Sequence, residues 1–316
     1  MSMKRFHGLG RWHGAGVVLL AVVLGAATPA AATLNVVTTT PDLAAIARAV
    51  GGDRVKVESL ALGTQDPHFV DPKPSFIIKL NRANLYVKRG LALEVGWAPV
   101  LENAARNANI LYEAPGYVDA SAGVVPLDIP TGAFSRALGD VHPYGSPHYQ
   151  LDPANGKIIA RNIVTGLARL DPAHRAYYEG RLQDFDARID KRLAKWVQML
   201  APYRGAKVVT YHVSWDYFAQ RFGLDIIGTM ESKPGVSPSP AHLARLITLM
   251  RAAHCHVIIK SPYYPENLTR VVAKKTGATV LVLPESPGGV PGTDDYFSFI
   301  DYCVRQLATA LAAKST

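Results

Sequence analysis

The sequence has little cysteine and lacks the cysteine spacings of common metal motifs. Its two cysteines, Cys255 and Cys303, lie far apart in a chain of 316 residues, and neither has a close cysteine partner. A disulfide-rich scaffold and a zinc finger are therefore excluded. In an oxidising compartment the two cysteines could form one disulfide, which we favour, and a metal site built on both is the alternative.

Long apolar runs and blocks of basic charge are also missing after residue 32. No apolar run there reaches the ~20 residues of a transmembrane helix, so we expect a soluble mature protein. The formal net charge is +9, and three positive charges lie in the first 32 residues, which leaves about +6. Without clustered basic residues, nucleic-acid binding has little support. Apolar residues make up 48% of the chain, which excludes a disordered protein.

The first 32 residues have the pattern of a secretory signal peptide. Basic residues, Lys4, Arg5 and Arg11, precede an apolar run at Ala15–Ala27 that is too short for a membrane span. Small residues follow and permit cleavage after Ala32. No cysteine lies at this cleavage site, so we expect a periplasmic protein without a lipid anchor. An N-terminal membrane anchor is the alternative.

After residue 32, strand and helix patterns alternate in two sets, which predicts an α/β fold with a parallel sheet in each of two lobes. Between the sets, apolar residues recur at helical spacing from residue 171 to residue 200. A helix of about 28 residues is about 42 Å long, enough to connect two lobes. We expect strands near residues 34–40, 55–61, 84–90, 110–114, 207–211, 225–230, 255–262 and 278–286. The predicted organisation is a signal peptide at 1–32, an N-terminal lobe at 33–170, a linking helix at 171–202 and a C-terminal lobe at 203–316.

Three of the ten histidines lie at the borders of predicted elements. His68 follows the second strand in TQDPHFVDP, His148 precedes a helix in PHYQLDPANG, and His212 follows a strand in KVVTYHVSW. Ligands of open parallel sheets bind beyond the carboxyl ends of the strands, so these residues could meet. Three neutral imidazoles suit zinc or another borderline transition metal. The other histidines have structural or solvent-exposed interpretations, or leave with the signal peptide, except His142.

A zinc site needs a fourth ligand, and several carboxylates are candidates. Glu285 is the best of them, because it follows the last predicted strand in VLPESPGG. Asp294 and Asp295 are alternatives, although a helix cap is a sufficient structural reason for them. Asp66 lies two residues before His68, and its side chain would point elsewhere.

Four segments, DPHFVDPKPS, NLYVKRGLALE, PHYQLDPANG and VVTYHVSWDYFAQRFGL, resemble in order the signatures of the zinc- and manganese-binding substrate-binding proteins of ABC transporters. The resemblance covers nearly all of the chain after residue 32. It implies two Rossmann-like α/β lobes joined by one long rigid helix, with metal in the cleft between them. It also implies that His68, His148 and His212 are ligands, and that Glu285 completes the site where many members have aspartate.

The resemblance favours zinc over manganese or iron. Manganese members tend to carry a carboxylate at the third ligand position, where this chain has His212. Zinc members often carry a disulfide that Cys255 and Cys303 would match. They also frequently carry a histidine-rich loop, which this chain lacks between residues 120 and 147. His142 in that segment is a remnant of such a loop or an accessory ligand.

The expected function is high-affinity periplasmic zinc binding for uptake and zinc homeostasis. A monomer would deliver Zn²⁺ to the permease and ATPase of an ABC transporter at the inner membrane, with Mn²⁺ or Fe²⁺ as alternative cargo. An exported zinc hydrolase is a second hypothesis, but no HExxH motif or evident general base is present. A binding protein for an iron chelate or haem is a third. A long linking helix further predicts a small motion of the lobes.

Overall fold

The computed structural model describes residues 1–4, 8, 33–131, 139 and 141–313. The predicted signal peptide lies almost wholly outside these residues, and so does part of the 120–147 segment. Within the described ranges, no helix is both long and apolar enough to cross a bilayer. Residues Thr33–Thr316 form one compact unit.

The first half of this unit contains a parallel four-stranded sheet with the strand order β2-β1-β3-β4. Because all of its strand pairs are parallel, the carboxyl ends of the four strands lie at one edge of the sheet. The connecting helices carry a proline at the first or second position, where its lack of an N–H leaves no donor unpaired. The elements are β1 (Leu34–Thr38), α1 (Pro41–Gly51), β2 (Val55–Ser59), α2 (Pro74–Asn81), β3 (Leu85–Lys88), α3 (Ala98–Ala105) and β4 (Tyr117–Asp119).

The prediction of a strand from Ile110 was wrong. Residues Ala108–Ile110 form a 3₁₀ turn, and β4 begins only at Tyr117. The Asn107 side chain stabilises the turn. Its amide group donates hydrogen bonds to the Leu80 and Ala83 carbonyls, and its side-chain oxygen accepts one from the Asn109 N–H. Ile110 is fully buried, so its apolar side chain serves the core from a turn rather than from a strand.

The second half repeats the same arrangement, with the parallel strand order β6-β5-β7-β8. Side-chain caps begin two of its helices. Ser239 accepts a hydrogen bond from the His242 N–H, and Asp295 forms a capping box with Ser298. The elements are β5 (Lys207–Thr210), α6 (Asp216–Phe222), β6 (Asp225–Thr229), α7 (Pro240–Ala252), β7 (Val257–Lys260), α8 (Glu266–Thr276), β8 (Thr279–Val282) and α9 (Tyr296–Ala312).

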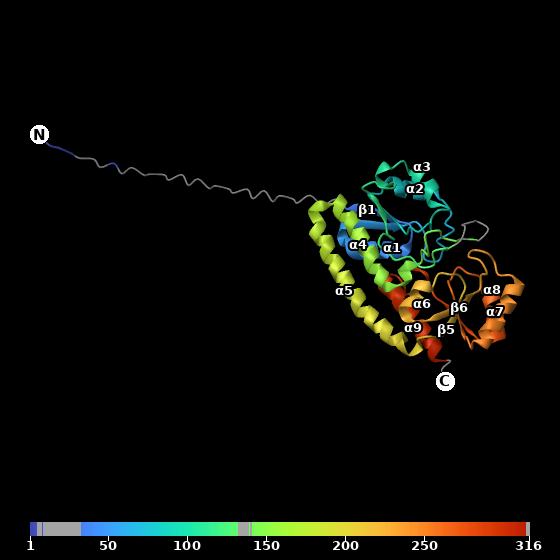
Figure 1. Ribbon diagram of the computed structural model, residues 1–316. Helices are drawn as coiled ribbons and strands as arrows, with labels where there is room; N and C mark the ends of the chain where they lie inside the picture. Colours follow the sequence, from blue (N-terminus) through green and yellow to red (C-terminus); the bar gives the residue numbers. More distant parts are fainter. Residues whose placement is uncertain (5–7, 9–32, 132–138, 140, 314–316) are drawn as a thin grey trace. The chain divides into compact units, whose positions relative to one another are not determined.

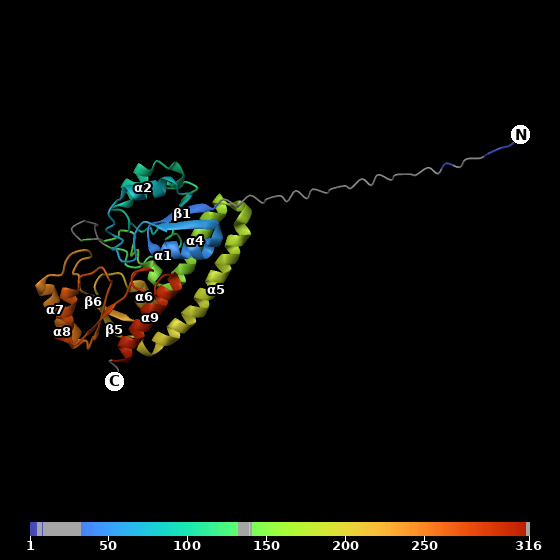
Figure 2. The same ribbon diagram turned by 180° about the vertical axis from the view of Figure 1, so that it is seen from behind.

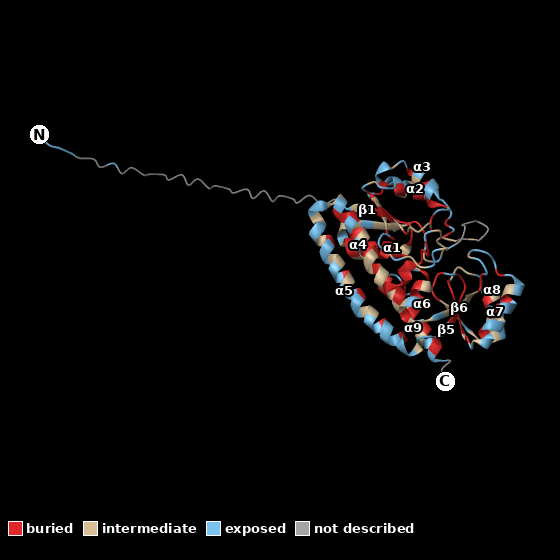
Figure 3. Ribbon diagram, viewed as in Figure 1, coloured by how far each residue is buried: buried red, intermediate tan, exposed pale blue. Residues whose placement is uncertain are grey.

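Two long helices, α4 (Pro153–Leu170) and α5 (Arg175–Leu200), connect the halves. Helix α5 contacts α1 and α4 of the first lobe and α6 and α9 of the second, and it runs along both in Figures 1 and 2. Its buried residues form one stripe, while its outer face is exposed in Figure 3. The prediction of two α/β lobes joined by a long helix is confirmed. The stripe consists of Tyr178, Phe185, Ile189, Trp196 and Leu200.

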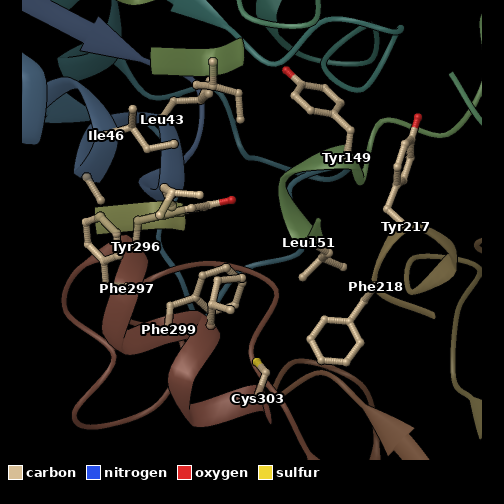
Figure 4. Packing of buried hydrophobic residues seen from close by; sticks show 14 of the residues in the cluster. Leu43, Ile46, Tyr149, Leu151, Tyr217, Phe218, Tyr296, Phe297, Phe299 and Cys303 are labelled. Carbon is tan, nitrogen blue, oxygen red and sulfur yellow. The ribbon is translucent and has the colours of Figure 1, made fainter. Parts of the chain in front are cut away.

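One apolar core runs through both lobes. It joins Leu43 and Ile46 of α1 with Phe297 and Phe299 of α9, and Figure 4 shows these side chains packed together. Smaller clusters lie under α2 and α3 in the first lobe and under α7 and α8 in the second. Because the central core is shared, separating the lobes would expose apolar surface to water, which costs free energy.

The predicted disulfide was wrong, since Cys255 and Cys303 are both free and buried. Cys255 belongs to the cluster under α7 and α8, where its thiol donates to the Lys207 carbonyl at 3.3 Å. Cys303 lies on α9 in the shared core (Figure 4) and contacts the Pro284 carbonyl. Packing thus places the two thiols in different layers of the lobe. Burial raises the pKa of the Cys303 thiol, which keeps it protonated and unreactive.

Candidate metal centre

Three loops bring the three predicted histidines together. His68 follows β2, His212 follows β5, and His148 precedes a 3₁₀ turn at Tyr149–Leu151 that leads into α4. Their ring centroids are 5.2 to 5.5 Å apart. The exposed fractions are 9% for His68, 1% for His148 and 2% for His212, so the rings share one buried site.

Carboxylates contact the Nδ1 atoms of two of these rings. Nδ1 of His68 lies 2.8 Å from Asp66 Oδ1, and Nδ1 of His212 lies 2.7 Å from Glu231 Oε2. A carboxylate on one ring nitrogen fixes the tautomer and makes the other nitrogen a stronger metal ligand. Nε2 of His212 is buried and has no hydrogen-bond partner. A buried imidazole nitrogen without a protein partner has a lone pair or N–H left to bind, so this atom could serve as a metal ligand.

His148 and Glu285 form the third such contact, at a longer distance. Nδ1 of His148 is 3.5 Å from Glu285 Oε2, and Nε2 of His148 has no partner although it is buried. The other carboxylate oxygen of Glu285 accepts hydrogen bonds from the hydroxyls of Ser214, at 2.8 Å, and Ser261. The structure therefore brings Glu285 into the site, beside the Nδ1 side of His148.

The alternative carboxylates are not brought there. Asp294 and Asp295 are exposed, and Asp295 accepts from the Ser298 N–H at 2.8 Å as the cap of α9. Asp66, which sequence reasoning expected to point elsewhere, instead holds the first histidine. The remaining histidines of the folded unit, other than His142, lie elsewhere: His174, His242, His254 and His256.

His142 joins the cluster from the 120–147 segment. Its Nε2 lies 3.1 Å from Nε2 of His68, and its ring centroid is 6.3 Å from that of His148. One possible ligand atom from each of these three histidines lies within 4.8 Å of the others. The ring of His212 lies beside two of these three, with its centroid 5.3 Å from that of His68 and 5.5 Å from that of His148.

The electrostatics of the site differ from ring to ring. Burial, together with the neighbouring histidines, holds the pKa of His148 well below its usual range. Burial also lowers the pKa of His142, to about 3. Burial disfavours charge on His212 too, but the hydrogen bond and charge of Glu231 outweigh it and raise the pKa of His212. The site therefore offers neutral nitrogens at His142 and His148, while a metal ion would compete with a proton at His212.

A buried polar network connects the site to the first lobe. The Arg89 guanidinium donates to the Pro147 carbonyl at 3.2 Å, to the side-chain oxygen of Gln150, and to Asp42. The Gln150 amide donates in turn to the Glu285 carbonyl at 3.0 Å. This network supports the backbone on both sides of His148.

Sequence reasoning missed Arg89, Glu231 and Ser261 as parts of the site. Each follows the carboxyl end of a strand, at β3, β6 and β7 respectively. The histidines were chosen because ligands bind beyond the carboxyl ends of parallel strands. The same rule, if extended to all polar residues, would have predicted these three as well.

Two α/β lobes with parallel sheets, which enclose buried imidazoles at their strand ends, define a class of metal-binding proteins. The model of one family of this class, described as "ZnuA: Zinc-uptake complex component A periplasmic", matches residues 36–310. The chain belongs to this family, whose members are the metal-binding substrate-binding proteins of ABC transporters and not enzymes.

The names of individual relatives refer to different metals, zinc for some and manganese for others. A crystal structure of ZnuA is 27% identical, with a TM-score of 0.76 over 88% of this chain and 99% of that one. A ZnuA deletion mutant described with zinc bound is also 27% identical, with a TM-score of 0.75 over 88% and 98% of the two chains. The manganese ABC transporter substrate-binding lipoprotein PsaA of Streptococcus anginosus is 26% identical over 289 residues, which cover 88% of this chain and 89% of PsaA.

Proposed function

We propose that the protein binds zinc with high affinity in the periplasm and delivers it to the permease and ATPase of an ABC transporter. The observation that carries this proposal is the set of buried imidazoles, two of which have unpartnered Nε2 atoms. Nitrogen donors suit zinc, whereas manganese prefers carboxylate and water oxygens. The similarity to a zinc-bound ZnuA supports the same metal.

The proposed ligands are His68, His148 and His212, with Glu285 as the candidate from the last strand. Pro147 and the 3₁₀ turn after His148 restrict the backbone around that ligand. A ligand that is already ordered loses less entropy when metal binds. Preorganisation of this kind supports high affinity.

The remaining proposals concern the organisation of the chain. Residues 1–32 would direct export and then be cleaved off. The mature protein would carry no lipid anchor and would act as a monomer. Lobes at 33–170 and 203–316, joined by a linking helix at 171–202, would hold the metal between them. The shared core opposes wide separation of the lobes, and the proposed motion is therefore small.

Manganese is the second candidate cargo. The named function of PsaA and the carboxylate of Glu285 inside the site favour it. Manganese prefers oxygen ligands, so it would need Glu285 as a direct ligand and would leave some imidazoles unused.

The test is metal affinity of the purified protein after chelation, measured with Zn²⁺, Mn²⁺ and Fe²⁺ in competition. We expect one tightly held Zn²⁺, and a loss of affinity of at least tenfold in His148→Ala and in His212→Ala. His174→Ala is the matched control, because His174 hydrogen-bonds to Asp171 at the start of α5 and is no part of the site. Equal zinc binding by all four proteins would contradict the site, and tighter Mn²⁺ binding would replace zinc as the cargo.

A further inference from the structure

We propose that His142 supplies the fourth ligand and that Glu285 orients His148 from behind, so that the ion is held by four imidazole nitrogens. This inference rests on the proposed function, because it names the ligands of the same zinc site. It changes the role of Glu285 from ligand to positioning residue.

The first argument is the spacing of the nitrogens. Zinc–nitrogen bonds are about 2.0–2.1 Å long, so two ligands of a tetrahedral ion lie about 3.3 Å apart. The Nε2 atoms of His68 and His142 are 3.1 Å apart, close to that edge length. Since Asp66 accepts the Nδ1 proton of His68, Nε2 of a neutral His68 carries a lone pair. That lone pair faces His142 and can receive either a proton or a metal ion.

The second argument is that the backbone holds the His142 ring. The ring hydrogen-bonds to the backbone of Ala92, in the turn after β3. Leu91 and Ala92 have φ values of 50° and 65°, a left-handed conformation that non-glycine residues rarely adopt. Such backbone collects at functional sites, where surrounding structure maintains it. Here it turns Ala92 toward the histidine.

The third argument concerns the carboxylates. Asp66 and Glu231 each lie at hydrogen-bond distance from Nδ1 of a site histidine, and Glu285 Oε2 lies on the Nδ1 side of His148, at 3.5 Å and without a hydrogen bond. The two nitrogens of one imidazole point away from each other. A carboxylate on the Nδ1 side of His148 is therefore poorly placed for an ion that Nε2 of the same ring would bind. Glu285 thus lies on the same side of its ring as Asp66 and Glu231 do.

The position of His142 also predicts how metal leaves. His142 is partly exposed, whereas His148 and His212 are buried, and it lines two cavities of about 340 and 770 Å³. Both cavities adjoin the cluster, so His142 stands between the buried rings and solvent. Its bond to zinc would then be the last to form and the first to break.

The experiment compares the parent with His142→Ala and Glu285→Gln, and His174→Ala serves as control. The imidazole ligands of bound Zn²⁺ are counted by X-ray absorption spectroscopy, and affinity and dissociation rate are measured by chelator competition. We expect four imidazoles in the parent and in Glu285→Gln. In His142→Ala we expect three imidazoles and one oxygen, at least tenfold weaker binding and faster dissociation. Thermal unfolding of the metal-free variants checks that they fold.

Two results would overturn the inference while leaving the proposed function intact. One is an unchanged imidazole count in His142→Ala, which would reduce the contact with His68 to a hydrogen bond. The other is an oxygen ligand in the parent that disappears in Glu285→Gln. A parent protein that binds no zinc would instead refute the proposed function itself.

Discussion

The buried pair of Arg89 and Asp42 offers a sharp test of how the fold supports the site. Their exposed fractions are 2% and 0%, and Arg89 also donates to the Pro147 carbonyl and to Gln150. In Arg89→Met the carboxylate of Asp42 would keep, from the residues that the structure describes, a hydrogen bond only from Ser286, at 2.9 Å. The variant thus leaves a buried charge without its cation.

Removing one partner of a buried ion pair costs about 3–5 kcal/mol of folding free energy, mostly because the other charge stays buried. We expect a loss in this range for Arg89→Met. Adding Asp42→Asn removes the stranded charge, so the double variant should be less destabilised than the sum of the two single variants. Zinc affinity should fall about tenfold in Arg89→Met, because the carbonyl before His148 loses its support.

Urea unfolding of the metal-free proteins measures the stability changes, and chelator competition measures zinc affinity. A loss of less than about 1 kcal/mol in Arg89→Met would mean that water or rearrangement satisfies Asp42. Strict additivity in the double variant would show that the two groups do not interact. Either result would refute the reasoning.

Four further predictions concern other parts of the fold. A Cβ at Gly63 would lie 2.2 Å from the Pro287 carbonyl oxygen, so Gly63→Ala should push the lobes apart and weaken zinc binding at least tenfold by titration. Gly180→Ala on α5 meets no atom within 4 Å and should instead stabilise the protein by about 0.5–1 kcal/mol in the same denaturation assay. Burial and a neighbouring carboxylate raise the pKa of Asp216 to about 7, so the folded state keeps a proton that the unfolded chain releases near its ordinary value of 3.8. Stability should therefore fall as pH rises from about 4 to about 7, and Asp216→Asn should reduce that fall in unfolding titrations. The same pH profile in both proteins would contradict this prediction. Because both cysteines are free, alkylation in denaturant without reductant should label two thiols per chain, and a single unlabelled pair would contradict the structure.

Much of the fold could be predicted from local sequence patterns. Alternating strand and helix patterns predicted both sheets, and the apolar spacing from Tyr178 to Leu200 predicted the long helix. Asp295 caps α9 as expected, because capping depends only on neighbours in the chain. The prediction of the fourth strand was wrong because that segment depends on distant residues. Asn107 donates hydrogen bonds to carbonyls more than twenty residues away, and these bonds keep Ile110 in a turn.

The sequence by itself determined that His68, His148 and His212 would stand at the ends of strands or the start of a helix, because those borders are local features. Only the tertiary structure decided which groups meet there. Packing separated the two cysteines into different layers, placed Glu231 behind His212, and brought His142 within 3.1 Å of His68 across 74 positions of sequence. Such contacts depend on how the lobes and loops pack, and no pattern within one segment encodes the distance to another.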